Sequence, residues 1–127
     1  MKQEIKNKWI DALRSGDYLR SVEELKYPHE RCVSVEGKLG TFTALGVLAD
    51  IYARENKLSW EKEAVSSCVW PLYTLKISES EKCRYSLGKT IREWAQISSL
   101  EERKIHDLND DVGFSFPETA DHIRNKL

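Results

Sequence analysis

The stretch that decides the fold runs from residue 41 to residue 53 and reads Thr-Phe-Thr-Ala-Leu-Gly-Val-Leu-Ala-Asp-Ile-Tyr-Ala. As a helix, it carries apolar side chains around most of its circumference, which is typical of a buried helix. The remaining strip holds Thr43, Gly46 and Asp50. We expect another backbone segment to approach over Gly46, and Asp50 to reach a partner or the rim of the core. The stretch is too short to cross a membrane, which takes about 20 apolar residues.

The length and composition of the chain fit one intracellular domain. Its 127 residues can bury a core of their own, so we expect a single domain over residues 1–127. The 20 basic and 21 acidic residues nearly cancel, and the broad basic surface of a general nucleic-acid binder is missing. Cys32, Cys68 and Cys83 lack the paired spacing of zinc or redox sites, and the charged N-terminal residues are unlike a signal peptide.

Two helices are predicted before the central stretch. Apolar residues at helical spacing predict an amphipathic helix over residues 2–14, with Gly16 as its stop. The pattern over residues 18–25 suggests a second, shorter helix that ends before Pro28, because the residue preceding a proline is disfavoured in a helix.

Strands are predicted on both sides of the central stretch. Residues 32–35 alternate between apolar and polar types and predict a short strand or hairpin that leads into the central helix. Residues 65–77 are rich in aromatic and β-branched types beside Pro71, which favours edge strands. The predicted fold class is therefore α+β, a compact domain in which amphipathic helices and a small sheet pack around a central buried helix.

The last third of the chain predicts helices joined by capped turns. An apolar stripe over residues 86–95 indicates one helix. Ser99 with Glu102, and then Ser115 with Glu118, have the spacing of capping boxes that start two further helices. The chain therefore closes in a helix-loop-helix whose final helix docks by its apolar side.

Between residues 107 and 118 the oxygen-bearing side chains have nearly the spacing of an EF-hand calcium loop. Val112 stands where that loop needs a glycine, and Gly113 follows it. In the competing interpretation, Gly113 takes a positive φ at the end of one helix and Ser115 caps the next, without metal. The candidate calcium ligands are Asp107, Asn109, Asp111, Ser115 and Glu118.

Three segments of the chain carry a family resemblance: residues 9–18, residues 45–50, and residues 108–116 followed by 120–123. The first reads Trp-Ile-Asp-Ala-Leu-Arg-Ser-Gly-Asp-Tyr, the second Leu-Gly-Val-Leu-Ala-Asp, and the third Leu-Asn-Asp-Asp-Val-Gly-Phe-Ser-Phe. In these segments the chain resembles a group of small proteins encoded by tailed bacteriophages and prophages. The resemblance implies a phage origin and a place in the cytoplasm of a bacterial host, and it carries no established activity.

The resemblance also bears on catalysis. Members of that group often have cysteines around the Leu-Gly-Val-Leu motif, where this chain has Thr43, Ala44 and Ala49, so a cysteine nucleophile is absent there. No spacing singles out a histidine and cysteine pair, and no nucleotide-binding, zinc-protease or hydrolase motif is present. The sequence thus leans away from an enzyme without excluding one.

We therefore predict a non-enzymatic binding protein that counteracts host defence, either by sequestering a small anionic nucleotide-type signal or by blocking a defence protein. Aromatic rings suited to stacking alternate with guanidinium groups suited to anions in the second half of the chain. A pocket between the subunits of a homo-oligomer would give such a ligand room. The candidate ligand-binding residues are Trp70, Tyr73, Arg84, Tyr85, Arg92 and Trp94, all of which could instead serve core and sheet packing.

Two alternatives remain open. The first is a structural adaptor whose closing helix-loop-helix, with or without calcium, presents a partner surface. The second is a nucleic-acid-binding regulator that uses Arg103, Lys104 and His106, although Asp107 and the acidic residues after it would repel phosphates.

Overall fold

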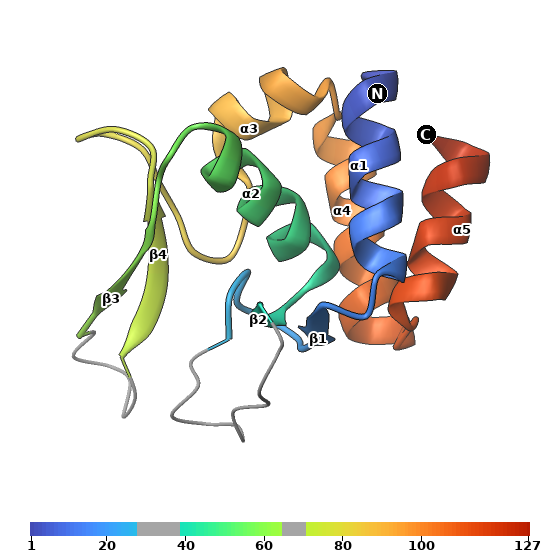
Figure 1. Ribbon diagram of the computed structural model, residues 1–127, viewed down its shortest axis with the longest axis horizontal. Helices are drawn as coiled ribbons and strands as arrows, with labels where there is room; N and C mark the ends of the chain where they lie inside the picture. Colours follow the sequence, from blue (N-terminus) through green and yellow to red (C-terminus); the bar gives the residue numbers. More distant parts are fainter. Residues whose placement is uncertain (28–38, 65–70) are drawn as a thin grey trace.

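Helix α2 (Ala44–Glu55) lies at the centre of the molecule, between a group of helices on one side and an antiparallel sheet on the other (Figure 1). The computed structural model describes residues 1–27, 39–64 and 71–127. The fold is α+β, as the sequence predicts. The other helices are α1 (Gln3–Arg14), α3 (Gly88–Ala95), α4 (Ser99–Asp107), the π-helix η2 (Leu108–Val112) and α5 (Phe116–Lys126).

The start of α2 is held by capping and by close backbone packing. The Thr43 hydroxyl accepts a hydrogen bond from the Gly46 N–H at 3.1 Å, which satisfies one of the free donors of the first turn. The Trp9 indole of α1 donates to the Ala44 carbonyl at 2.9 Å. A Cβ atom at Gly46 would overlap the carbonyl group of Leu25, so the predicted backbone approach over this glycine is confirmed.

Asp50 also behaves as predicted, because it is buried and gathers three donors. Its carboxylate accepts hydrogen bonds from the Tyr18 hydroxyl at 2.6 Å, from the Arg54 guanidinium at 2.7 Å and from the Trp60 indole at 3.1 Å. Burial is the main cause that raises the pKa of Tyr18, and the hydrogen bond from its hydroxyl to Asp50 is the second. Asp50 thus ties α2 to the strands on either side of it.

Two small sheets flank α2. In the first, β1 (Tyr18–Arg20) pairs in parallel with β2 (Gly40–Phe42). In the second, the strand order is β3-β4-β5 and both pairings are antiparallel. Its strands are β3 (Trp60–Glu63), β4 (Leu72–Lys76) and β5 (Lys82–Cys83).

Two predictions about these strands are wrong. Residues 18–25 are not a helix, because β1 pairs with β2 and the backbone then turns at Glu23, whose φ is 72°. Residues 72–76 form the middle strand of their sheet and not an edge, because β3 and β5 pair with opposite sides of β4. The strand predicted over residues 32–35 lies outside the described residues.

The helices on the other side of α2 are α1, α4 and α5, and α1 packs along α5 (Figure 1). The predicted capping box of α5, formed by Ser115 and Glu118, is confirmed. The box that starts α4 consists of Ser98 and Glu101, one residue earlier than predicted. Glu102, the residue predicted for this box, is buried instead. Its carboxylate accepts the Leu87 N–H at 3.0 Å and so fixes the start of α3.

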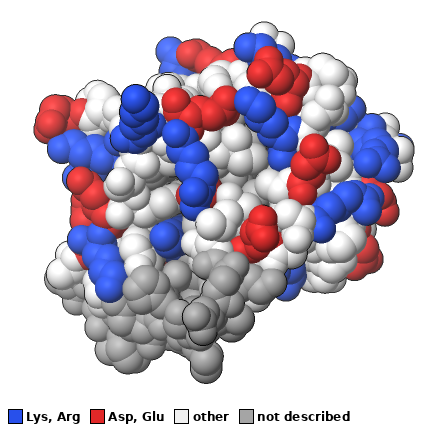
Figure 2. Space-filling model, in the orientation of Figure 1, with Lys and Arg blue, Asp and Glu red and all other residues white. Residues whose placement is uncertain are grey.

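The face seen in Figure 2 shows no large region of one charge among the described residues. Figure 2 shows Lys and Arg side chains interspersed with Asp and Glu side chains over the visible face. Within residues 1–27, 39–64 and 71–127, no helix has the length and apolar character needed to span a membrane. Cys83 is a buried core residue, and burial raises its pKa to about 12.

Candidate functional site: the His106 groove

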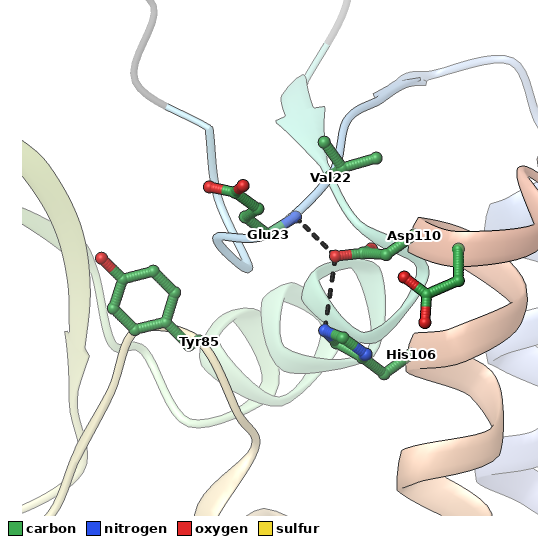
Figure 3. Close-up of a pocket in the computed structure, with 6 residues that line it drawn as sticks. Val22, Glu23, Tyr85, His106 and Asp110 are labelled. Atoms are coloured by element: carbon green, nitrogen blue, oxygen red, sulfur yellow. Dashed lines mark hydrogen bonds and ion pairs between the residues drawn. The ribbon is translucent and has the colours of Figure 1, made fainter.

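A groove runs along α4, where three parts of the chain meet (Figure 3). One part of it is a pocket of about 400 Å³, and an adjoining pocket of about 430 Å³ shares Tyr85 and His106 with it. We call the two together the His106 groove. The first pocket is lined by Val22, Glu23, Tyr85, His106, Asp110 and Asp111. The second adds Leu45, Ser86, Ser99, Glu102, Arg103 and Asp107.

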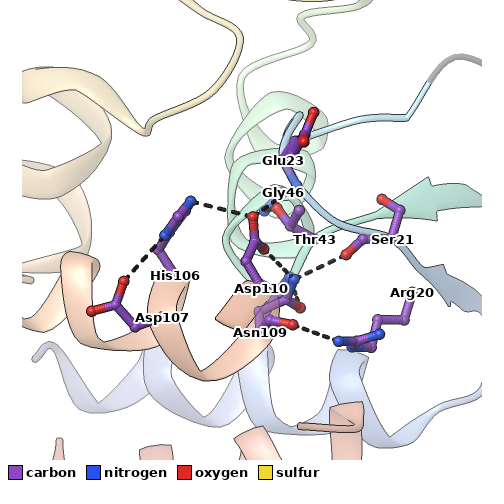
Figure 4. Close-up of polar contacts among 10 residues, drawn as sticks. Arg20, Ser21, Glu23, Thr43, Gly46, His106, Asp107, Asn109 and Asp110 are labelled. Atoms are coloured by element: carbon purple, nitrogen blue, oxygen red, sulfur yellow. Dashed lines mark hydrogen bonds and ion pairs between the residues drawn. The ribbon is translucent and has the colours of Figure 1, made fainter. Parts of the chain in front are cut away.

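The π-helix η2 shapes one wall of this groove. Such wide turns are rare and often occur at functional sites. Gly113 ends the turn with a φ of 83°, a conformation that glycine adopts without strain. The wall is fixed by Asn109, whose side chain is buried: its amide oxygen accepts the Ala44 N–H at 3.1 Å, and its amide nitrogen donates to the Ser21 carbonyl at 2.9 Å (Figure 4).

Asp110 is held in place from several directions. Its carboxylate accepts the Glu23 N–H at 2.9 Å and the Asn109 side-chain amide at 2.7 Å. The left-handed backbone at Glu23 is uncommon for a residue with a side chain and costs free energy. Because that N–H bonds to Asp110, the strained turn and η2 brace each other.

His106 lies between two carboxylates. Its Nε2 atom is 3.3 Å from Asp110 Oδ2, one helical turn away, and its Nδ1 atom is 3.5 Å from Asp107 Oδ1. A protonated imidazole can donate to both carboxylates, whereas a neutral one can donate to a single carboxylate. Within the described part of the chain, His106 makes no hydrogen bond to a serine, threonine or cysteine side chain, the contact that would activate a nucleophile.

The chemistry of the groove is acidic with an aromatic side. Figure 3 shows Tyr85 across the groove from His106 and Asp110, with Glu23 above them. The Tyr85 side chain is 49% exposed. The acidic residues along the groove outnumber Arg103 and His106. Such a surface attracts a positively charged group and repels phosphate.

The predicted ligand-binding residues that the structure describes do not come together in one pocket. Tyr85 lines the groove, but the Trp94 ring packs edge-on against Tyr52, with ring centroids 5.1 Å apart. The remaining members are placed separately: Arg92 pairs with Glu102 at 3.2 Å, Arg84 pairs with Glu63 at 2.9 Å, Tyr73 is buried in β4, and Trp70 lies outside the described residues.

The predicted calcium ligands are likewise used in other ways. Glu118 accepts the Ser115 N–H at 3.0 Å, and this capping contact lowers the pKa of Glu118. Asn109 bonds to backbone groups, Asp107 approaches His106, and Asp111 lines the groove. Across the ranges that the structure describes, no group of three or more His, Cys, Asp or Glu side chains surrounds a metal position. Gly113 takes a positive φ and Ser115 caps α5, as the competing interpretation predicts, and calcium binding itself stays a prediction.

A family model described as Domain of unknown function (DUF8296) matches residues 1–127. The chain belongs to this family. No curated protein and no solved structure matches the chain. The family description names no activity. The phage resemblance stays a prediction.

Few residues of this site have a local signal in the sequence. The pattern places His106 only in a candidate nucleic-acid surface and singles out neither Val22 nor Glu23. One signal was available, because His106 and Asp110 are four residues apart and such pairs meet on a helix. The contribution of Glu23 had no local signal, since it depends on a tertiary contact with Asp110.

Proposed function

We propose that this protein is a non-enzymatic binding protein whose His106 groove holds a basic side chain, arginine or lysine, of a protein partner. The observation that carries the proposal is the placement of an aromatic ring, Tyr85, opposite a wall of carboxylates in one open groove. A guanidinium group stacks on an aromatic face and binds carboxylates with two parallel hydrogen bonds.

The fixed positions of the carboxylates in the groove support this assignment. Asp110 is already fixed by backbone and side-chain donors, so it contributes charge from a set position. Glu23 and Asp111 lie on the same pocket and supply two more carboxylates. Positions set before binding reduce the ordering cost that association must overcome.

Of the two modes of action expected from the sequence, the groove favours blocking a protein over sequestering a nucleotide. Arg84 and Arg92, the cations predicted to hold phosphates, are each paired with a glutamate of the same chain. On the resemblance to phage proteins, we further propose that the partner is a host defence protein and that binding takes place in the bacterial cytoplasm.

The test is a calorimetric titration with two short peptides, one carrying Arg-Leu at its centre and the other Glu-Leu. We expect the arginine peptide to bind and the glutamate peptide not to bind. The double substitution Glu23→Gln with Asp111→Asn should weaken arginine-peptide binding at least about tenfold, which corresponds to about 1.4 kcal/mol.

A matched control separates local contacts from net charge. Asp11 and Glu93 lie outside the groove on α1 and α3, so Asp11→Asn with Glu93→Gln removes the same charge and should leave the affinity unchanged. Equal losses in both double variants would overturn the assignment. If a nucleotide binds and the arginine peptide does not, the result would support the nucleotide-sequestering function instead.

A further inference from the structure

A second hollow lies between α4 and α5, outside the His106 groove. Its volume is about 380 Å³. We call it the Leu100 hollow, and it is lined by Leu100, Glu101, Lys104, His122, Lys126 and Leu127. A volume of this size lies at the low end for ligand pockets and suits one or two side chains.

The first indication that this hollow binds a partner is the exposure of Leu100. Its side chain is 78% exposed, more than that of any other large apolar residue in the described ranges. Leu100 lies in the first turn of α4, and that turn is already capped by Ser98 and Glu101. The fold therefore gains little from a leucine at this position, whereas a partner could bury it.

The second reason is the positive charge on the rim of the hollow. Lys104 and Lys126 lie on the rim, and neither makes an ion pair with a carboxylate among the residues that the structure describes. The carboxylate of Glu101 accepts the Ser98 N–H at 2.9 Å and so is held in the helix cap. Burial, and then the charges of the two lysines, lower the pKa of His122. An anion would relieve this repulsion.

We propose that the Leu100 hollow is a docking site for an acidic, apolar peptide segment of a protein partner. An aliphatic side chain of that segment covers Leu100 and Leu127, and a neighbouring carboxylate meets Lys104 and Lys126. The apolar floor and the cationic rim are complementary to these two features. This site is separate from the His106 groove and does not depend on the function proposed for it.

The size and charge of the surface select this occupant. A nucleic acid needs an extended basic surface to follow its backbone, and the chain has 20 basic against 21 acidic residues. A membrane surface needs a broader apolar face than one hollow of this volume. A peptide needs a single anchoring side chain and a nearby charge.

The experiment uses the full chain and an acetylated, amidated hexapeptide of sequence Asp-Glu-Leu-Leu-Glu-Asp. Calorimetry should show binding, and nuclear magnetic resonance should show that the imidazole of His122 gains a higher pKa when the peptide is present. A peptide with lysines in place of the acidic residues, and one with Ser-Ser in place of Leu-Leu, should each bind at least tenfold more weakly.

Variants then locate the site. Lys104→Gln with Lys126→Gln should reduce affinity at least tenfold, and so should Leu100→Ser, because one contact is ionic and the other apolar. Lys57→Gln with Lys76→Gln makes the same charge change just after α2 and in β4, outside the residues that line the hollow, and should have no effect. Leu100 is exposed, so its variant should fold with an unchanged amide spectrum outside α4 and α5.

Several results would overturn the proposal. They are absence of binding at millimolar peptide, equal binding of the lysine-substituted peptide, and affinity that is unchanged in both hollow variants. Self-association that Leu100→Ser abolishes would assign the hollow to a second copy of the chain. Binding to phosphatidylglycerol vesicles without binding to the peptide would assign it to a membrane.

Discussion

Helix α4 contributes to two hollows, the His106 groove along one side and the Leu100 hollow on the side that faces α5, and the fold uses their residues differently. In the groove, Asp110 is tied to Glu23 and Asn109 by hydrogen bonds. In the Leu100 hollow, Lys104 and Lys126 make no ion pair within the described part of the chain. The groove is therefore coupled to folding, whereas the charges of Lys104 and Lys126 are not engaged in ion pairs that hold the described fold together.

The largest expected effect comes from Gly46→Ala, which disrupts the close packing of α2 against the backbone at Leu25, behind the groove. The new Cβ would overlap the Leu25 carbonyl and push the segment that carries Glu23 away from α2. Overpacking of this kind costs about 3 kcal/mol or more of unfolding free energy, because backbone and not a flexible side chain must move. Urea denaturation measures it, with Leu100→Ala as a control that should change stability by less than about 0.5 kcal/mol. Equal stability of the two variants would contradict the stated difference, namely that the groove is coupled to folding and Leu100 is not.

Asn109→Ala should have the next largest effect. It leaves the buried Ala44 N–H and the part-buried Ser21 carbonyl without their side-chain partner, and each lost contact costs about 1–3 kcal/mol. We expect a loss of about 2–4 kcal/mol in urea denaturation. Asn125 is exposed near the end of α5, so Asn125→Ala is the matched control and should be nearly neutral. A neutral Asn109→Ala would show that η2 is held by other contacts.

Asp110→Asn should cost less stability and more binding. An amide oxygen can still accept the Glu23 N–H, but the charge beside His106 disappears. We expect a stability loss of about 1 kcal/mol. Affinity for the arginine peptide should fall in the same variant. Unchanged affinity together with lower stability would reduce Asp110 to a purely structural residue.

The smallest expected effect concerns pH and the Leu100 hollow. The folded-state pKa of His122 is lowered by burial and by Lys104 and Lys126. The unfolded chain then binds more protons below the ordinary histidine pKa of about 6.5, so stability is present above that pH and falls as the pH drops. His122→Gln should flatten this part of the stability profile between about pH 7 and pH 5, as measured by thermal unfolding.

The same hollow allows a direct check of that pKa. Lys104→Gln removes one repelling charge, so the pKa of His122 should rise toward its ordinary value in a nuclear magnetic resonance titration. A lower pKa in this variant would contradict the assigned cause. Glu101 is the acidic residue that lines the hollow. Glu101→Gln removes a negative charge and is the opposite control, because the pKa of His122 should then fall.

The sequence predicted those parts of the fold that depend on local pattern. The central helix, the uses of Gly46 and Asp50, and the cap formed by Ser115 and Glu118 followed from periodicity and spacing. The predicted helix over residues 18–25 failed because β1 finds its partner at residues 40–42, and periodicity within one segment does not report that pairing.

By itself, the sequence determined which segments could be helices and which helix would be most buried, because helical periodicity is a local property. The tertiary structure alone decided that Glu23 in a strained turn would donate to Asp110, and that Tyr85 would face His106 across a groove. It also decided that Lys104 and Lys126, from different helices, would flank one exposed leucine. These contacts join residues far apart in the chain, and their energies exist only after the elements have packed.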